Sequence, residues 1–453
     1  MKKRSAGLVI AIAVIILELI GGMQTYLNQL ILPILAKDLH AQNLYGVIMG
    51  VSAIASMAGL PIGAALMNRM RLPRLLMGAT VFLVLGACTS AAAPHISIYL
   101  LGAVIRGLAG STLAMTSIGA VALGLSGRAR RLTLAFSSAS WVVSSVVGPA
   151  YAAWVTHLLS WRWAMLLYLP LLLVVRFVIA LNLQTAGERK ESPFSYTALL
   201  LIVAGVGITI IPAAGPLKIV LMVIGVAVLG RVAVLLMPQG TFTQKTPRRA
   251  ALAGMLFLTG GYFAGNELVS LTAHDLYQAG PDALGVIIMG GGLGWAVVGV
   301  VCGIKPATTR RGYQLRVIFS LGFIALAALF FAAWIFSGWR PVSATPVFCI
   351  AWTLAGIGIG IAYLDTLNIF FDDPDEPDGI TIEEMASSAV IVESLASTMF
   401  IPLTTSIVAL AFVSGDGVST LPYGITWLLI AVSIFLSFGY LRHTYPAHPA
   451  YPA

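Results

Sequence analysis

Residues 101–111 (LGAVIRGLAGS), 137–154 (SSASWVVSSVVGPAYAAW) and 160–170 (SWRWAMLLYLP) contain the features that decide the fold of this chain. Arg106 lies inside an otherwise apolar run, and the pair Gly148-Pro149 interrupts the next run. Apolar runs of this length are expected to lie in a bilayer, where a buried charge and a broken helix are both expensive. The stretch therefore indicates a functional region inside a membrane.

The overall composition agrees with a membrane location. The chain has 453 residues, of which 59% are hydrophobic and 9% charged, and its mean hydropathy is +0.95. A soluble domain of this size needs far more surface charge, so the composition indicates a polytopic membrane protein. The formal net charge of +9 fits basic loops on one side of a bilayer better than a nucleic-acid partner. The three cysteines have no ligand spacing, and we expect neither a metal site nor a disulfide.

Apolar runs of about twenty residues recur along the whole chain. The first run contains Glu18 and lacks a small-residue cleavage site, which indicates a retained helix and not a signal peptide. The pattern predicts about fourteen transmembrane helices, near residues 7–35, 44–67, 74–93, 97–125, 132–158, 162–183, 196–213, 217–237, 250–272, 283–304, 315–337, 345–371, 385–413 and 422–441.

The distribution of basic residues predicts the orientation. With the N-terminus inside, nineteen Lys and Arg residues fall on the cytoplasmic side, and only Lys37, Arg162, Lys218 and Arg340 fall on the other. Removing one helix of the pair at 196–237 would move the later basic loops outside. By the positive-inside rule, both termini are predicted to be cytoplasmic. We expect a multi-pass protein of the bacterial cytoplasmic (inner) membrane.

The helix count divides into six, an inserted pair and six more. This predicts an all-α fold with an N-terminal six-helix bundle (1–190), an inserted helix pair with its linkers (191–245), a C-terminal six-helix bundle (246–443) and a Pro-rich tail (444–453). A weak internal repeat supports two related halves, because AKDLHAQNLYGVIMG from residue 36 resembles AHDLYQAGPDALGVIIMG from residue 273. Many transporters are built from such repeats, and chance similarity between apolar segments is the alternative.

Catalytic motifs are missing from the sequence. It has no Gly-rich phosphate loop, no paired metal ligands and no nucleophile–base arrangement. We therefore expect no enzyme activity and no cofactor, and the lack of an ATP-binding segment excludes a self-powered pump. The acidic stretch FFDDPDEPDG (370–379) contains two prolines, so we interpret it as a solvated turn and not as a divalent-cation site.

From Arg106 onward, three features in order resemble the major facilitator superfamily, specifically its drug:proton antiporters. The family's fourth helix carries an arginine followed four residues later by a glycine, as Arg106 and Gly110 do. Its fifth helix carries a small residue, Gly-Pro and a small pair, and its sixth begins with Trp-Arg-Trp and has a later proline. The matching residues are Ser144, Gly148, Pro149, Ala152, Ala153, Trp161, Arg162, Trp163 and Pro170. Fourteen helices with a central pair resemble the fourteen-helix branch, which implies alternating access driven by a proton gradient.

Two positions depart from the family pattern. The loop after helix 2 should carry an acidic residue before its arginine, but this chain has Asn68 before Arg69, so the charge network of the cytoplasmic gate is weakened or replaced. Helix 1 should carry an acid at the position of Gln24, and its acid is Glu18 instead. The gating residues that the resemblance implies are Asn68, Arg69, Gly110, Gly148 and Pro149.

Charged residues inside the predicted helices are candidates for proton coupling or substrate binding. Counting about 1.5 Å per residue from opposite helix ends places Glu18 and Arg106 at similar depths. We predict that they pair and that protonation of Glu18 loosens Arg106; a static salt bridge is the alternative. Glu267, Glu393 and Asp365 are the other candidates. The alternative for Glu267 is a buried hydrogen-bonded carboxyl, and for Asp365 it is contact with interfacial water.

The pair Gly148-Pro149 and five apolar or aromatic residues complete the candidate site. Proline removes a backbone hydrogen bond and glycine has no side chain, so helix 5 can bend and pack closely there; a kink without a dynamic role is the alternative. The candidate lining residues of an apolar pocket are Met115, Trp141, Tyr151, Tyr262 and Phe263, with core packing or lipid contact as the alternative.

The sequence thus predicts a proton-coupled secondary transporter that exports amphipathic or cationic organic compounds. We expect a monomer whose partners are a small amphipathic substrate, protons and the lipid bilayer, without nucleic acid. The first alternative is a major facilitator exporter of a specific metabolite, antibiotic or lipid. The second is a non-transporting membrane sensor or assembly protein, which would need a soluble output domain, whereas no loop exceeds about twenty residues.

Overall fold

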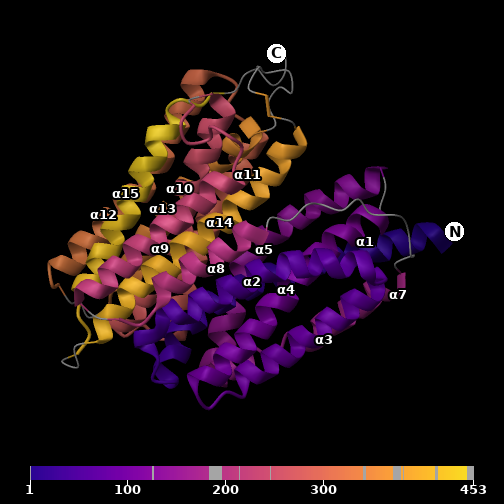
Figure 1. Cartoon of the computed structure of the whole chain (residues 1–453), viewed down its shortest axis with the longest axis horizontal. Helices are drawn as coiled ribbons and strands as arrows, with labels where there is room; N and C mark the ends of the chain where they lie inside the picture. Colours follow the sequence, from indigo (N-terminus) through magenta and orange to yellow (C-terminus); the bar gives the residue numbers. More distant parts are fainter. Residues whose placement is uncertain are drawn as a thin grey trace. The chain divides into compact units, whose positions relative to one another are not determined.

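The computed structural model describes residues 2–124, 127–182, 196–213, 215–244, 246–339, 343–370, 379–380, 382–413 and 417–445, which form helices and short connections without a strand (Figure 1). Most of the acidic stretch at 370–379 and most of the Pro-rich tail lie outside these residues. The described part confirms the predicted all-α architecture.

The chain divides into two compact units. Unit 1 comprises Met1–Ala41 and Val51–Leu199, and unit 2 comprises Gln42–Gly50 and Leu200–Ala453. Figure 1 colours the helices of unit 1 mainly indigo to purple and those of unit 2 mainly magenta to yellow. The short segment Gln42–Gly50 follows the first helix in sequence but packs within unit 2.

Unit 1 is built from the N-terminal helices. Its elements are α1 (Lys2–Asp38), most of α2 (Tyr45–Arg69), α3 (Leu72–Ala91), α4 (Ile96–Gly124), α5 (Gly127–Leu158), α6 (Trp161–Ala164) and α7 (Leu169–Asn182), and α8 (Tyr196–Ile210) begins in it. The predicted sixth span is found as the candidate membrane span Trp161–Asn182, which α6 and α7 form together. Pro170 occupies the first turn of α7, where the missing amide hydrogen breaks no helical hydrogen bond.

Unit 2 contains the remaining elements. They are η1 (Gln42–Leu44), the first turns of α2, most of α8, α9 (Gly215–Leu236), α10 (Pro247–Tyr277), α11 (Pro281–Ile304), α12 (Arg310–Phe336), α13 (Thr345–Phe370), α14 (Ile382–Val408), η2 (Ala409–Phe412) and α15 (Leu421–Leu441).

Among the described residues, eleven helical segments are long and apolar enough to cross a membrane, against the fourteen predicted. The predicted spans that are not among the eleven correspond to α5, α8 and α10. Helix α8 has only 15 residues. Helices α5 and α10 have 32 and 31 residues and begin with basic side chains, Arg128, Arg130 and Arg131 in α5 and Arg248 and Arg249 in α10. The multi-pass character is confirmed, and the number fourteen stays a prediction.

Small residues let the helices of each unit pack closely, as expected where lipid gives no hydrophobic driving force between helices. Along α5, Ser140, Ser144 and Gly148 recur every four residues and face α1. The hydroxyls of Ser140 and Ser144 donate to the backbone carbonyls of Ile15 and Leu19 at 3.3 and 2.9 Å. A Cβ atom on Gly148 would lie 3.1 Å from the backbone of Met23 in α1. In unit 2, glycines of α11 and α13 make a similar close contact.

Candidate functional site

Arg106 of α4 binds a neutral side chain in unit 1. Its Nη2 donates to Oδ1 of Asn28 in α1 at 3.0 Å. Each residue lies ten positions from the predicted outer end of its helix, Ile96 for α4 and Asp38 for α1, which is a depth of about 15 Å. The guanidinium is half-buried and Asn28 is exposed on the surface of the unit. The arginine that the sequence singled out therefore has an amide as its hydrogen-bond partner.

The predicted pair of Glu18 and Arg106 is wrong. Glu18 acts electrostatically on Arg176 of α7 instead, and it lies ten residues from Asn28, about 15 Å along α1. Counting depth from opposite helix ends failed because α1 has 37 residues, about 55 Å, which exceeds the bilayer core of about 30 Å. Arg176 is buried, with 8% of its surface exposed, and it was not among the predicted site residues.

A carboxylate accepts several hydrogen bonds at the predicted outer end of unit 1. Oδ2 of Asp38, at the end of α1, accepts hydrogen bonds from Arg162 Nη1 at 2.6 Å and from Trp161 Nε1 at 3.1 Å. Arg162 Nη2 also donates to the carbonyl of Ala93. Trp161 is buried, whereas Trp163 is exposed. The motif Trp-Arg-Trp thus joins α6 to α1.

A second carboxylate occupies the corresponding place in unit 2. Asp275 is buried at the end of α10, and its Oδ2 accepts from the hydroxyls of Tyr45 and Tyr423 at 2.9 and 2.5 Å. Its Oδ1 lies 2.8 Å from Nδ1 of His274 and 3.4 Å from Nε2 of Gln42. We call these five residues the Asp275 cluster. They join α10, α15 and the segment Gln42–Gly50.

One carboxylate and three aromatic rings form a connected group in unit 2. The hydroxyl of Tyr363 in α13 donates to Oε1 of Glu393 in α14. The ring of Tyr363 packs edge-on against Trp295 of α11, with centroids 5.4 Å apart, and Trp295 also contacts Phe263 of α10. Phe263, Trp295, Tyr363 and Glu393 are all half-buried, whereas Tyr262 is 2% exposed and belongs to the packed core. We call the four half-buried residues the aromatic–carboxylate site.

Glu267 of α10 lies in the same helix as Phe263. Its Oε2 is buried and has no hydrogen-bond partner among the described residues. The preceding residue, Asn266, accepts a hydrogen bond from Nε1 of Trp352 at 3.0 Å, and Trp352 stacks on Tyr262 with centroids 5.4 Å apart. A carboxylate oxygen that is removed from water and unpartnered is unusual, because buried polar atoms are nearly always hydrogen-bonded.

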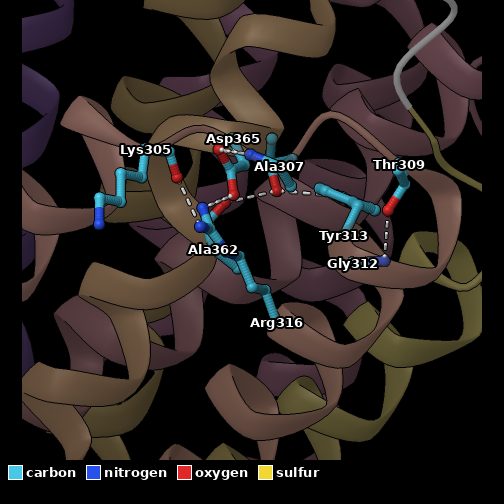
Figure 2. A network of polar contacts seen from close by, with 9 residues as sticks. Lys305, Ala307, Thr309, Gly312, Tyr313, Arg316, Ala362 and Asp365 are labelled. Atoms are coloured by element: carbon cyan, nitrogen blue, oxygen red, sulfur yellow. Dashed lines mark hydrogen bonds and ion pairs between the residues drawn. The ribbon is translucent and has the colours of Figure 1, made fainter. Parts of the chain in front are cut away.

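Asp365 lies in a polar network at the predicted inner end of unit 2. Figure 2 shows Arg316 of α12 pointing at Asp365 of α13, and the two side chains form an ion pair of 2.6 Å. The other Asp365 oxygen accepts from the backbone amide of Ala307 at 3.2 Å, and Arg316 Nη2 donates to the carbonyl of Lys305 at 2.5 Å. Asp365 is buried and does not face interfacial water. Both of its oxygens are engaged, so it fixes the α11–α12 loop in this conformation.

The first turns of α12, which follow the α11–α12 loop, make two further polar contacts. The hydroxyls of Tyr313 and Thr366 lie 2.9 Å apart, and Thr309 caps α12 by accepting from the amide of Gly312 at 3.1 Å (Figure 2). This inner loop was not singled out from the sequence. The sequence feature that could have predicted this loop is the placement of Arg316 near the start of α12 and of Asp365 near the end of α13. Two antiparallel helices bring these positions together.

The remaining predicted residues are dispersed. The side chains of Asn68 and Met115 lie outside the described part, and Arg69 is exposed at the end of α2. Helix α5 is continuous through Pro149, and a Cβ atom on Gly110 would meet only one side-chain atom, at 4.0 Å. Trp141 is exposed. The Tyr151 hydroxyl donates to the carbonyl of Ala164 at 2.9 Å and so ties α5 to α6. The gating and pocket roles of these residues stay predictions.

Comparison with known proteins decides the family. The model of the Major Facilitator Superfamily matches residues 14–375. The chain belongs to the Major Facilitator Superfamily. It is therefore a transporter of the membrane, and the predicted family is confirmed. A crystal structure of a D-xylose–proton symporter shares the fold, with a TM-score of 0.60, 13% sequence identity, and coverage of 94% of this chain and 97% of that chain.

Several curated relatives of this major facilitator are efflux proteins. A probable multidrug-efflux transporter of Mycobacterium tuberculosis is 24% identical over 410 residues, covering 84% of each chain. The multidrug efflux pump SdrM of Staphylococcus aureus is 20% identical over 207 residues, covering 45% of this chain and 46% of its own length. The acurin A biosynthesis cluster transporter of Aspergillus aculeatus is 26% identical over 183 residues, 40% of this chain and 33% of its own. The chain spans only a third to a half of the length of these last two relatives.

Proposed function

We propose that this major facilitator exports amphipathic or cationic organic compounds in exchange for protons. The observation that carries the proposal is the aromatic–carboxylate site, in which Glu393 accepts a hydrogen bond from Tyr363, the Tyr363 ring contacts Trp295, and Trp295 contacts Phe263, all four being half-buried. The similarity to proteins named as multidrug efflux transporters supports the same direction of transport.

The chemistry of these side chains suits a cation with an apolar body. Ring faces of Trp, Tyr and Phe attract a desolvated cation by about 2 kcal/mol each in favourable cases, and they also bind apolar surface. Glu393 supplies the opposite charge within the same group of residues. Because the four side chains are only half-buried, they present a surface that a ligand can contact without dismantling the core.

Glu267 supplies the coupling in this proposal. A charged, unpartnered carboxylate inside a membrane costs several kcal/mol, so the buried Oε2 favours a bound proton in this conformation. Release of that proton when the protein changes conformation, and uptake of a cation in its place, would link the two fluxes. The competition of proton and cation for carboxylates in one bundle is the simplest antiport mechanism that these residues allow.

Dye efflux from cells tests the proposal. We expect an efflux-deficient bacterial host that produces this protein to lose preloaded ethidium faster than the empty host, and E393Q to slow that loss at least tenfold at equal protein abundance. The control is D282N, because Asp282 is an exposed acid in the first turn of α11. Efflux by E393Q equal to wild type would contradict the role of the aromatic–carboxylate site.

Export of one specific metabolite, antibiotic or lipid is the second candidate function. Asn68 favours it, because the acid that the drug:proton antiporter pattern places in the loop after helix 2 is replaced by an amide. The relative from a biosynthesis cluster is consistent with such a role. A panel of chemically diverse toxic compounds separates the two candidates, because a multidrug exporter protects against several scaffolds and a dedicated exporter against one.

A further inference from the structure

Arg106, in the middle of α4, has no acidic partner among the described residues of unit 1. Residues 1–182 contain only two acidic side chains, Glu18 and Asp38. Asp38 forms its ion pair with Arg162 at 2.6 Å, and Glu18 acts electrostatically on Arg176. Within the described residues of unit 1, Arg106 therefore has no carboxylate available, and its hydrogen bond goes to the amide oxygen of Asn28.

The stem of Arg106 is fixed while its head stays accessible. A Cβ atom on Gly86 of α3 would lie 2.9 Å from Cγ of Arg106, so the missing side chain of Gly86 makes room for the arginine stem. The guanidinium reaches Asn28, which is exposed, and acts electrostatically on Tyr168 of the α6–α7 turn. A positioned cation is thus presented on the surface of unit 1, about 15 Å from the predicted outer helix ends.

This surface is unsuited to lipid. Ionisable side chains in membrane-spanning helices almost always face the interior of the protein or a water-filled cavity, because contact with hydrocarbon costs several kcal/mol. Both Arg106 and Asn28 are polar, and they lie on two different helices yet meet at one place. The physical expectation is that this place faces water or a polar ligand.

We propose that Arg106 and Asn28 form a subsite for the acidic group of the transported compound. A guanidinium binds a carboxylate through two parallel hydrogen bonds, and charge-assisted bonds of this kind are about twice as strong as neutral ones. The Oδ1 atom of Asn28 is occupied by Arg106, which leaves its amide hydrogens to donate to the same carboxylate. The preferred substrates are then amphipathic compounds that carry a carboxylate as well as a cation. The inference rests on the proposed export function and specifies its substrate class.

Two dyes that differ in one group test the subsite. Rhodamine 110 carries a xanthylium cation and a free carboxylate, and rhodamine 123 is its methyl ester. Binding to the purified full-length protein in detergent is measured by fluorescence anisotropy at pH 7. We expect wild type to bind the acid about tenfold more tightly than the ester, from the usual strength of hydrogen bonds to a charged group. R106Q is expected to remove this difference, and R106K and N28A to reduce it while binding of the ester stays unchanged.

Matched controls make each outcome decisive. R162Q removes an arginine that already has a carboxylate partner, so it should retain the preference for the acid. Ester binding reports whether each variant is folded. Equal binding of the two dyes by wild type, or an unchanged preference in R106Q, would overturn the subsite and leave the proposed export function intact. Failure of wild type to bind or export either dye would instead contradict the export function, and the subsite with it.

Discussion

Asp38 and Asp275 are aligned in the sequence repeat and lie at corresponding places in the two units, but their side chains have different partners and different exposure. Each lies at or near the end of a long helix, α1 or α10, and accepts a hydrogen bond from the first turn of another helix, α6 or α15. Asp38 meets an arginine, and both side chains stay partly exposed, 36% for Arg162 and 44% for Asp38. The Asp275 side chain is fully buried and meets two phenols.

The difference shows that both units keep the aspartate, whereas its hydrogen-bond donors differ between them. An aspartate at a helix end is a good acceptor for any donor on the neighbouring helix, so the position can be kept while the partners change. Exposed ion pairs add little stability, about 0–1 kcal/mol, because water and salt screen them. A buried carboxylate must have its hydrogen bonds satisfied by the protein. Unit 2 meets that requirement with Tyr45, His274 and Tyr423, and unit 1 does not need to.

Removing the two carboxylates gives the largest expected contrast. D275A leaves the hydroxyls of Tyr45 and Tyr423 buried without an acceptor, and we expect it to lower the free energy of unfolding by about 3 kcal/mol. D38A should lower it by less than about 1 kcal/mol, because its pair is exposed. Thermal unfolding in detergent measures both. Equal losses in the two variants would break the comparison.

Single phenol deletions dissect the Asp275 cluster. Y423F and Y45F each remove one donor while the carboxylate keeps the other, so we expect a loss of about 1–2 kcal/mol for each. The two effects should be non-additive, because both hydroxyls donate to the same oxygen. The same unfolding assay gives the values, with Y277F as the control on α10 outside the cluster. Losses below those of the control would show that the cluster does not hold α15 and residues 42–50 together.

The smallest expected effect is the coupling between Asp38 and Arg162. A double-mutant cycle with D38N and R162Q should give an interaction energy of about 0.5 kcal/mol that decreases in high salt. A coupling of several kcal/mol that does not change with salt would mean that the surroundings of Asp38 exclude water as well as those of Asp275 do.

Much of the fold is legible in the sequence, because it follows from composition and spacing. Apolar runs predict where the helices lie, and Arg106, Gly148 and Trp161 indicate the family. The spacing of residues could not predict which side chain each charged residue contacts. Arg106 and Glu18 were paired by depth alone, yet packing of α1 against α4 sets Asn28 opposite Arg106, and α7 brings Arg176 to Glu18. Side-chain pairing depends on helix rotation, which apolar sequences specify weakly.

The same limit applies to unit 2. Glu267, Glu393 and Asp365 could be named because charged residues stand out in an apolar run. Trp295 and Tyr363 were missed, since a single aromatic residue in such a run is ordinary. Only the contacts between α11, α13 and α14 reveal that Tyr363 donates to Glu393 and that Trp295 packs against Tyr363.

Proton-driven ethidium uptake into proteoliposomes tests the central claim most directly. Purified protein is reconstituted, an acidic lumen is imposed, and ethidium accumulation is followed by fluorescence with and without a protonophore. We predict accumulation by wild type and D282N that the protonophore abolishes. We predict that E267Q, which cannot exchange a proton at the buried position, gives no net accumulation but still equilibrates the dye down its own gradient. Accumulation by E267Q equal to that of wild type, with the same sensitivity to protonophore, would contradict the account.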